Sequence, residues 1–148
     1  MINSKAVRPF FLLICLILIL PVAGCSANQV DQEYIDFSAI AAENYLIAIN
    51  NKDFNSFSQD LNEDMREALP EEEFLSFADQ IEGIIGKYEP GSKKLDRTKK
   101  DSGYIVIIYN AEYTEEPENV VVTISLQRTG NKIEIAGSWF NSPKLRGE

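Results

Sequence analysis

The sequence contains no histidine and only two cysteines, Cys15 and Cys25, among its 148 residues. Zinc, copper and haem sites draw mainly on histidine and cysteine ligands, so we expect no metal and no cofactor. Ser–His and Cys–His nucleophilic catalysis is excluded for the same reason. Basic residues are also few, 14 against 23 acidic ones, and the formal net charge is −9. Nucleic-acid binding needs clustered lysine and arginine, so nucleic acid is not an expected partner.

One long apolar run is present, and it lies close to the beginning of the chain. Lys5 and Arg8 are the only charges before it, and the run itself is FFLLICLILIL, residues 10–20. A positive start, an apolar centre and small residues after it are typical of a secretory signal peptide. A retained transmembrane helix is the alternative, but it needs about 20 apolar residues, and this run is shorter. We therefore expect residues 1–24 to be a signal peptide that is cleaved.

The residues that follow the run, Val22-Ala23-Gly24-Cys25, resemble the lipobox of bacterial and archaeal lipoproteins. The resemblance implies that the sulfur of Cys25 carries a diacylglyceryl group and that Cys25 becomes the mature N-terminus. A disulfide is the alternative, but Cys15 would be removed with the signal peptide. Because two acyl chains give stable anchoring, we expect an extracytoplasmic protein held at the cell membrane by its lipid. Residues 25–32 would form a short polar tether with a reach of about 27 Å.

Three amphipathic helices are predicted in the next part of the chain. Apolar residues recur at three- and four-residue steps from Asp31 to Ile49, which indicates a long helix. Asp53 is a suitable N-cap for a second, short helix. Pro70 suits the first position of a third helix, and Gly86 suits its C-terminal cap.

The apolar period changes from helical to two after Gly86. Strands are predicted at Tyr104–Tyr113, Asn119–Arg128 and Lys132–Phe140, with an additional weaker strand within Lys87–Lys100. The turn at residues 129–131 makes the last two strands a hairpin. Helices first and antiparallel strands afterwards indicate an α+β domain with its helices on one face of the sheet.

The order of elements, together with the fragments YLIAINNKDFNSF, REALPEEEFLSF and GSWFNSPKL, resembles the DUF3887 family of small extracytoplasmic domains. The resemblance implies membership of the NTF2-like superfamily, in which a bent sheet wraps a long helix into a cone. Residues 33–148 would then be an NTF2-like domain with three N-terminal helices packed on a curved antiparallel sheet. Members of this superfamily include enzymes as well as binding and dimerisation modules, so the fold does not choose a function.

Three aromatic residues, Tyr45, Tyr109 and Trp139, are the candidate pocket residues at the mouth of such a cone. Trp139 is expected to be buried. The leading hypothesis is a binding module for a protein partner or a small apolar ligand, with a homodimer as a further arrangement. The alternative is a small enzyme in which a pocket tyrosine such as Tyr45 and a carboxylate transfer a proton. Core packing remains the simpler role for these aromatic residues.

One segment, KKLDRTKKD at residues 93–101, concentrates five basic residues in this acidic protein. It could contact anionic headgroups or an acidic partner. A solvated edge strand, on which lysines discourage aggregation, explains it more simply.

Overall fold

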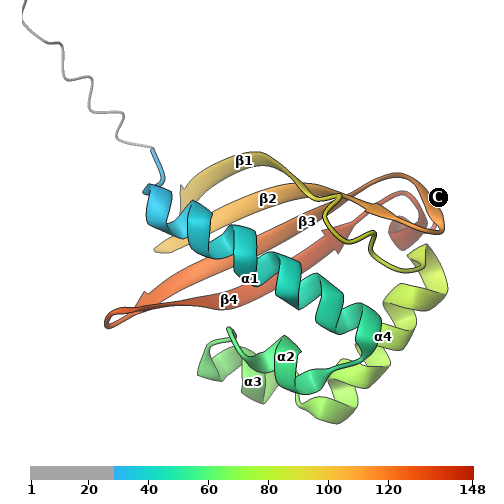
Figure 1. The fold of residues 1–148 in the computed structure, drawn as a ribbon, viewed down its shortest axis with the longest axis horizontal. Coiled ribbons are helices and arrows are strands. Elements are labelled where there is room, and N and C mark those ends of the chain that lie inside the picture. Colours follow the sequence, from blue (N-terminus) through green and yellow to red (C-terminus); the bar gives the residue numbers. More distant parts are fainter. Residues whose placement is uncertain (1–28) are drawn as a thin grey trace, which may run out of the picture.

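The computed structural model describes residues 29–148 (Figure 1). Cys25 and the predicted signal peptide lie outside the described residues. The described part forms α-helices and an antiparallel sheet, which confirms the α+β class. In chain order the elements are α1 Gln32–Asn51, α2 Phe54–Ser58, α3 Glu63–Ala68, α4 Glu71–Ile85, β1 Lys94–Asp101, β2 Tyr104–Tyr113, β3 Glu116–Thr129, β4 Lys132–Asn141 and the short 3₁₀ helix η1 Lys144–Arg146.

Helix α1 is the long amphipathic helix that the apolar repeat predicts. It runs across one face of the sheet (Figure 1), and Tyr45 and Leu46 are among its buried side chains. The helix ends at Asn51 because Lys52 takes a left-handed conformation, with φ of 54°. The backbone N–H of Lys52 bonds back to carbonyl groups in the last turn, which closes the helix.

Three shorter helices follow α1, so the prediction of three helices in all was wrong by one. The side chains of Asp53 and Asn62 cap α2 and α3 by accepting hydrogen bonds from the backbone N–H groups of Ser56 and Met65. None of the α3 residues is buried. This segment therefore has no apolar periodicity that could have indicated a helix. The predicted third helix is α4, which ends before Gly86 as expected.

The strands form an open sheet in the order β1-β2-β3-β4, with every neighbouring pair antiparallel. The three predicted strong strands and the weaker first strand are confirmed, although β3 begins earlier than expected, at Glu116. Gly130 and Asn131 form the turn between β3 and β4. The φ of 61° at Gly130 is the left-handed conformation that two-residue hairpin turns require. The free edge of β4 is partly closed by a bridge between Ile135 and Leu61.

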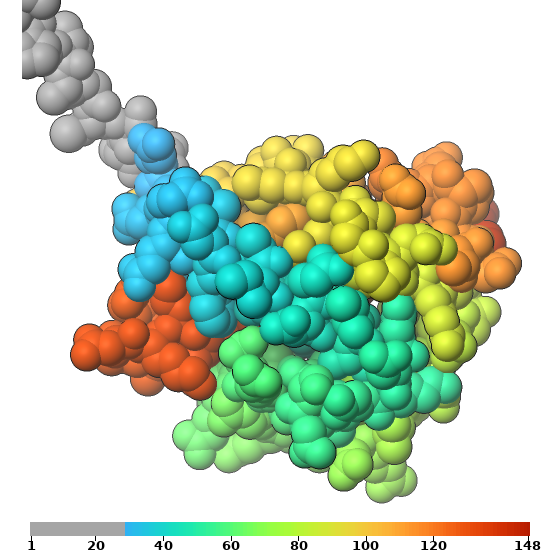
Figure 2. All heavy atoms as spheres, viewed as in Figure 1, coloured from blue at the N-terminus to red at the C-terminus, as the bar shows by residue number. Residues whose placement is uncertain are grey.

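The hydrophobic core lies between α1, α2, α4 and one face of the sheet (Figure 1). The space-filling view shows the helices closely packed over this face (Figure 2). The ring of Phe57 packs between those of Tyr45 and Phe74, at centroid distances of 4.7 Å and 4.2 Å. Ile107 and Ile124, which are directly paired on β2 and β3, are fully buried beneath the helices. The face of the sheet that carries these two residues is called the inner face below, and the opposite one the outer face.

A β-bulge at Ala136 decides which side chains of β4 reach the core. Ile135 pairs with Leu126 and Gly137 pairs with Ser125, so Ala136 has no partner across the strand pair. The extra residue shifts the alternation of the strand, and Trp139 points to the outer face with 59% of its surface exposed. The prediction that Trp139 is buried was therefore wrong, because it assumed an uninterrupted period of two.

Candidate functional site

The candidate pocket residues Tyr45 and Tyr109 are both buried in the protein interior. The hydroxyl of Tyr45 lies 2.6 Å from Ser138 Oγ, and the hydroxyl of Tyr109 donates to Ser38 Oγ at 2.9 Å. Burial raises the pKa of both tyrosines. Both hydroxyls therefore stay protonated at neutral pH and join α1 to the sheet. Trp139 faces the opposite side of the sheet, so the structure does not bring the three candidate residues together.

A tyrosine and a carboxylate do meet in this structure, but they are Tyr88 and Glu43. Tyr88 Oη donates to Glu43 Oε2 at 2.9 Å, and Lys93 Nζ lies 3.0 Å from the same oxygen. Glu43 Oε1 accepts a hydrogen bond of 2.8 Å from the backbone N–H of Gly91. Both carboxylate oxygens are thus engaged by groups of the protein itself. This arrangement holds the carboxylate in place against the segment between α4 and β1.

The pKa values in this network follow from its geometry. Burial raises the pKa of Glu43, but the hydrogen bonds from Lys93, Gly91 and Tyr88 outweigh burial and hold it below the ordinary value of 4.5. Burial, together with the bond to Glu43, raises the pKa of Tyr88 to about 12. Glu43 is therefore ionised and Tyr88 neutral at neutral pH.

The same network fastens the segment between α4 and β1 to helix α1. The side chain of Asn50 bonds both the N–H and the carbonyl of Tyr88, at 2.9 Å and 2.8 Å. The ammonium group of Lys93 lies 5.5 Å from the ring centre of Tyr109, and the Lys93 side chain is only 12% exposed. Sequence reasoning missed this network, because Glu43 and Tyr88 are 45 positions apart and neither belongs to a recognisable motif.

An apolar hollow lies on the surface between the first turns of α1 and the beginning of β4. Its volume is about 450 Å³, and Phe37, Ile40 and Ile133 supply its apolar lining. We call these three residues the apolar groove. Ile40 is 68% exposed, so this apolar side chain is in contact with the solvent. Exposed apolar hollows bordered by polar side chains, here Glu33 and Lys132 among others, are typical of binding sites.

The outer face of the sheet carries a row of side chains across all four strands. The row is Arg97, Ile108, Thr123 and Trp139, each paired directly with the next. Residues that pair directly across antiparallel strands point to the same face. The arginine of β1 and the tryptophan of β4 thus mark the two ends of this row, and apolar and hydroxyl groups lie between them.

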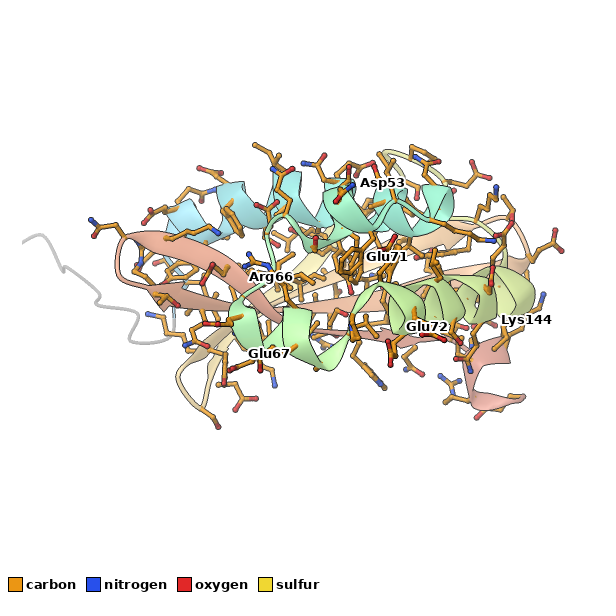
Figure 3. The ribbon with its side chains drawn as sticks, turned by 90° about the horizontal axis from the view of Figure 1, so that it is seen from below. Asp53, Arg66, Glu67, Glu71, Glu72 and Lys144 are labelled. Carbon is orange, nitrogen blue, oxygen red and sulfur yellow. The ribbon has the colours of Figure 1, made fainter. Side chains whose placement is uncertain are left out.

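A polar hollow of about 750 Å³ lies beyond β4, between helix α3 and the β3–β4 hairpin. Figure 3 shows two of its lining residues, Arg66 and Glu67, on α3. Acidic groups outnumber basic ones in the lining, which is Asn62, Glu63, Asp64, Arg66, Glu67, Gln127, Thr129 and Glu134. No group of three or more acidic side chains within residues 29–148 is placed to hold a metal ion.

Comparison with protein families gives one result. A family model described as "Protein of unknown function (DUF3887)" matches residues 42–134. The chain belongs to the DUF3887 family. This confirms the resemblance inferred from the sequence fragments. A search of curated proteins finds no match for this DUF3887 protein.

The DUF3887 match covers some of the features described above and not others. The Glu43–Tyr88–Lys93 network, Tyr45 and Tyr109 lie within residues 42–134. Ile40 of the apolar groove and Trp139 of the outer face lie outside that span. Within the described part of this DUF3887 protein, none of the helices has the length and apolar character needed to cross a membrane.

Proposed function

We propose that this DUF3887 protein is a lipid-anchored binding module of the NTF2-like type on the extracytoplasmic face of the cell membrane. Its apolar groove would hold an apolar group of a protein partner or of a small ligand. The observation that carries this proposal is the exposed Ile40 in an apolar hollow of about 450 Å³. The interior is less suited to binding a ligand, because the hydroxyls of Tyr45 and Tyr109 are hydrogen-bonded within the protein.

The position of the groove agrees with attachment through Cys25. Helix α1 begins at Gln32, seven residue steps after Cys25, so a lipid on Cys25 would lie within a reach of about 24 Å of the helix. Ile40 lies only about 12 Å further along the helix. The groove would therefore stay close to the bilayer surface, where it could receive a partner in the membrane or a ligand released from it.

Replacing Cys25 with serine tests the anchor. We expect the wild-type chain to incorporate labelled fatty acid in bacterial cells and to sediment with membranes. The Cys25→Ser variant should lose the label completely, because serine has no sulfur to accept the lipid. The assignment of Cys25 is wrong if the variant still incorporates fatty acid.

The groove is tested with residues 29–148, once circular dichroism has shown that this fragment unfolds cooperatively. We expect the neutral apolar dye Nile red to bind saturably with a blue-shifted emission. Ile40→Asp should weaken binding at least tenfold, since a carboxylate in an apolar hollow loses its hydration. Leu75→Asp is the matched control, because Leu75 is an exposed apolar residue on α4 away from the groove. Equal binding by the two variants would contradict a site at the groove.

A further inference from the structure

Within residues 29–148, the helices pack against the inner face of the sheet and none forms a layer on the outer face. Trp139 is the only tryptophan of the chain, and it lies on this face with 59% of its surface exposed. Val106 and Ile108, on the same face of β2, are largely covered by neighbouring side chains. A large exposed aromatic residue at the end of an apolar row is typical of an interface.

Charge is distributed unevenly across this face. On the β1 side the outward residues are Lys94, Arg97, Lys99 and Asp101, as their pairing with outward residues of β2 shows, and Lys99 forms an ion pair with Asp101. Beyond β4 the polar hollow presents Glu63, Asp64, Glu67 and Glu134 against Arg66, and Lys132 on β4 forms an ion pair with Glu134. One edge of the outer face therefore has a net positive charge, and the opposite edge a net negative charge. Two copies of such a surface are complementary in charge when one is rotated by 180° relative to the other, so that opposite edges meet.

We infer that the outer face binds a second copy of this chain, with a two-fold axis that runs parallel to the strands. Rotation about such an axis places β1 of one copy opposite β4 of the other. Arg97 and Trp139 belong to the same row, so each arginine then faces the tryptophan of the other copy. Within one copy the two residues are three strands apart, about 14 Å, and Arg97 contacts Asp96 instead. The dimer thus contains two equivalent cation–π contacts and brings each basic edge onto an acidic one.

The lipid anchor selects this axis over the perpendicular one, so the direction of the axis rests on the proposed function. Helix α1 begins at the end of the sheet that holds the β1–β2 and β3–β4 turns (Figure 1). An axis parallel to the strands keeps both helix beginnings at the same end of the dimer. Two lipid tethers can then enter one membrane. An axis perpendicular to the strands would point them in opposite directions.

The size of the face predicts a weak dimer that depends on the membrane. Four strands about eight residues long cover roughly 500 Å² of flat area, whereas a standard interface buries about 800 Å² on each partner. Confinement of two copies to one bilayer raises their effective concentration and favours association without any further contact. We therefore expect dimers to form as the protein becomes dense on the membrane.

The test uses the fluorescence of Trp139 in the full chain, bound to phosphatidylcholine vesicles at increasing protein-to-lipid ratio. We expect acrylamide quenching to fall at least twofold as the density rises, because the second copy covers the indole. Arg97→Glu should remove this protection and leave Trp139 quenchable at every density. Lys100→Glu is the matched control, since Lys100 lies on the same strand, pairs with Ile105 and faces the other side of the sheet.

Several results would overturn the dimer. A second copy is rejected if Trp139 stays equally accessible at all densities, or if contact with the bilayer shields it equally at all densities. Protection that survives Arg97→Glu in a folded variant places the interface elsewhere. Failure of the chain to float with vesicles contradicts the lipid anchor alone, and the same quenching series is then run against protein concentration in solution.

Discussion

Replacement of Ile107 with aspartate is expected to abolish folding of the domain. Ile107 is fully buried at the centre of the sheet, where it pairs with Ile124 on one side and Thr98 on the other. Its surroundings are apolar, so an aspartate would lose its hydration without a partner. An uncompensated buried charge together with a lost isoleucine side chain costs about 5 kcal/mol or more. A domain of this size has a total stability of only about 5–15 kcal/mol.

Circular dichroism and urea unfolding would measure this loss. Ile107→Val is the conservative control, and we expect it to cost about 1 kcal/mol because it removes a single methylene. Asn110→Asp places a carboxylate on the same strand but on the outer face, and it should leave the fold intact. A cooperative unfolding transition for Ile107→Asp near that of the wild type would show that the inner face has been assigned incorrectly.

Replacement of Glu43 with glutamine is expected to destabilise the domain by about 1–3 kcal/mol at neutral pH, because it leaves Lys93 without its counter-charge in a partly buried place. Lys93 is only 12% exposed, and Glu43 also holds Tyr88 and Gly91. Glutamine keeps the shape of the side chain, so the loss reports charge and hydrogen bonding. Urea unfolding at a series of pH values would measure it.

The lowered pKa of Glu43 determines how the stability difference between the wild type and the Glu43→Gln variant changes with pH. The pKa of Glu43 is lowered in the folded protein, so its ionised form stabilises the fold above the ordinary pKa of 4.5. This contribution is lost as the pH falls through the lowered folded-state pKa. The difference between wild type and Glu43→Gln should therefore be largest at neutral pH and shrink in acid. Glu33→Gln is the control, because the Glu33–Arg128 pair is exposed, and its loss should change the stability little. Equal losses for the two variants would contradict a special role for Glu43.

Periodicity in the sequence was sufficient for the elements with one buried side. The stripes of α1 and α4 and the alternation of β3 follow from burying one face, and the structure confirms them. The alternation of β4 holds only as far as the bulge at Ala136. β1 was predicted as the weaker strand because its polar side chains suit an edge, and it does lie at the edge. Helix α3 was missed because it buries none of its residues. The Asn62 side chain caps this helix, and a cap does not produce a periodic pattern of apolar residues in the sequence.

The sequence by itself determined the fold class, the order of the main elements and most of the core, because the burial of apolar side chains follows their spacing along the chain. Only the tertiary structure decided the direction of Trp139, since the one extra residue at Ala136 reverses the strand's alternation without changing its composition. It likewise decided the partners of Glu43. Tyr88 and Lys93 meet this carboxylate because the chain between α4 and β1 returns to α1. Contacts between residues so far apart depend on how the elements pack, which local spacing does not encode.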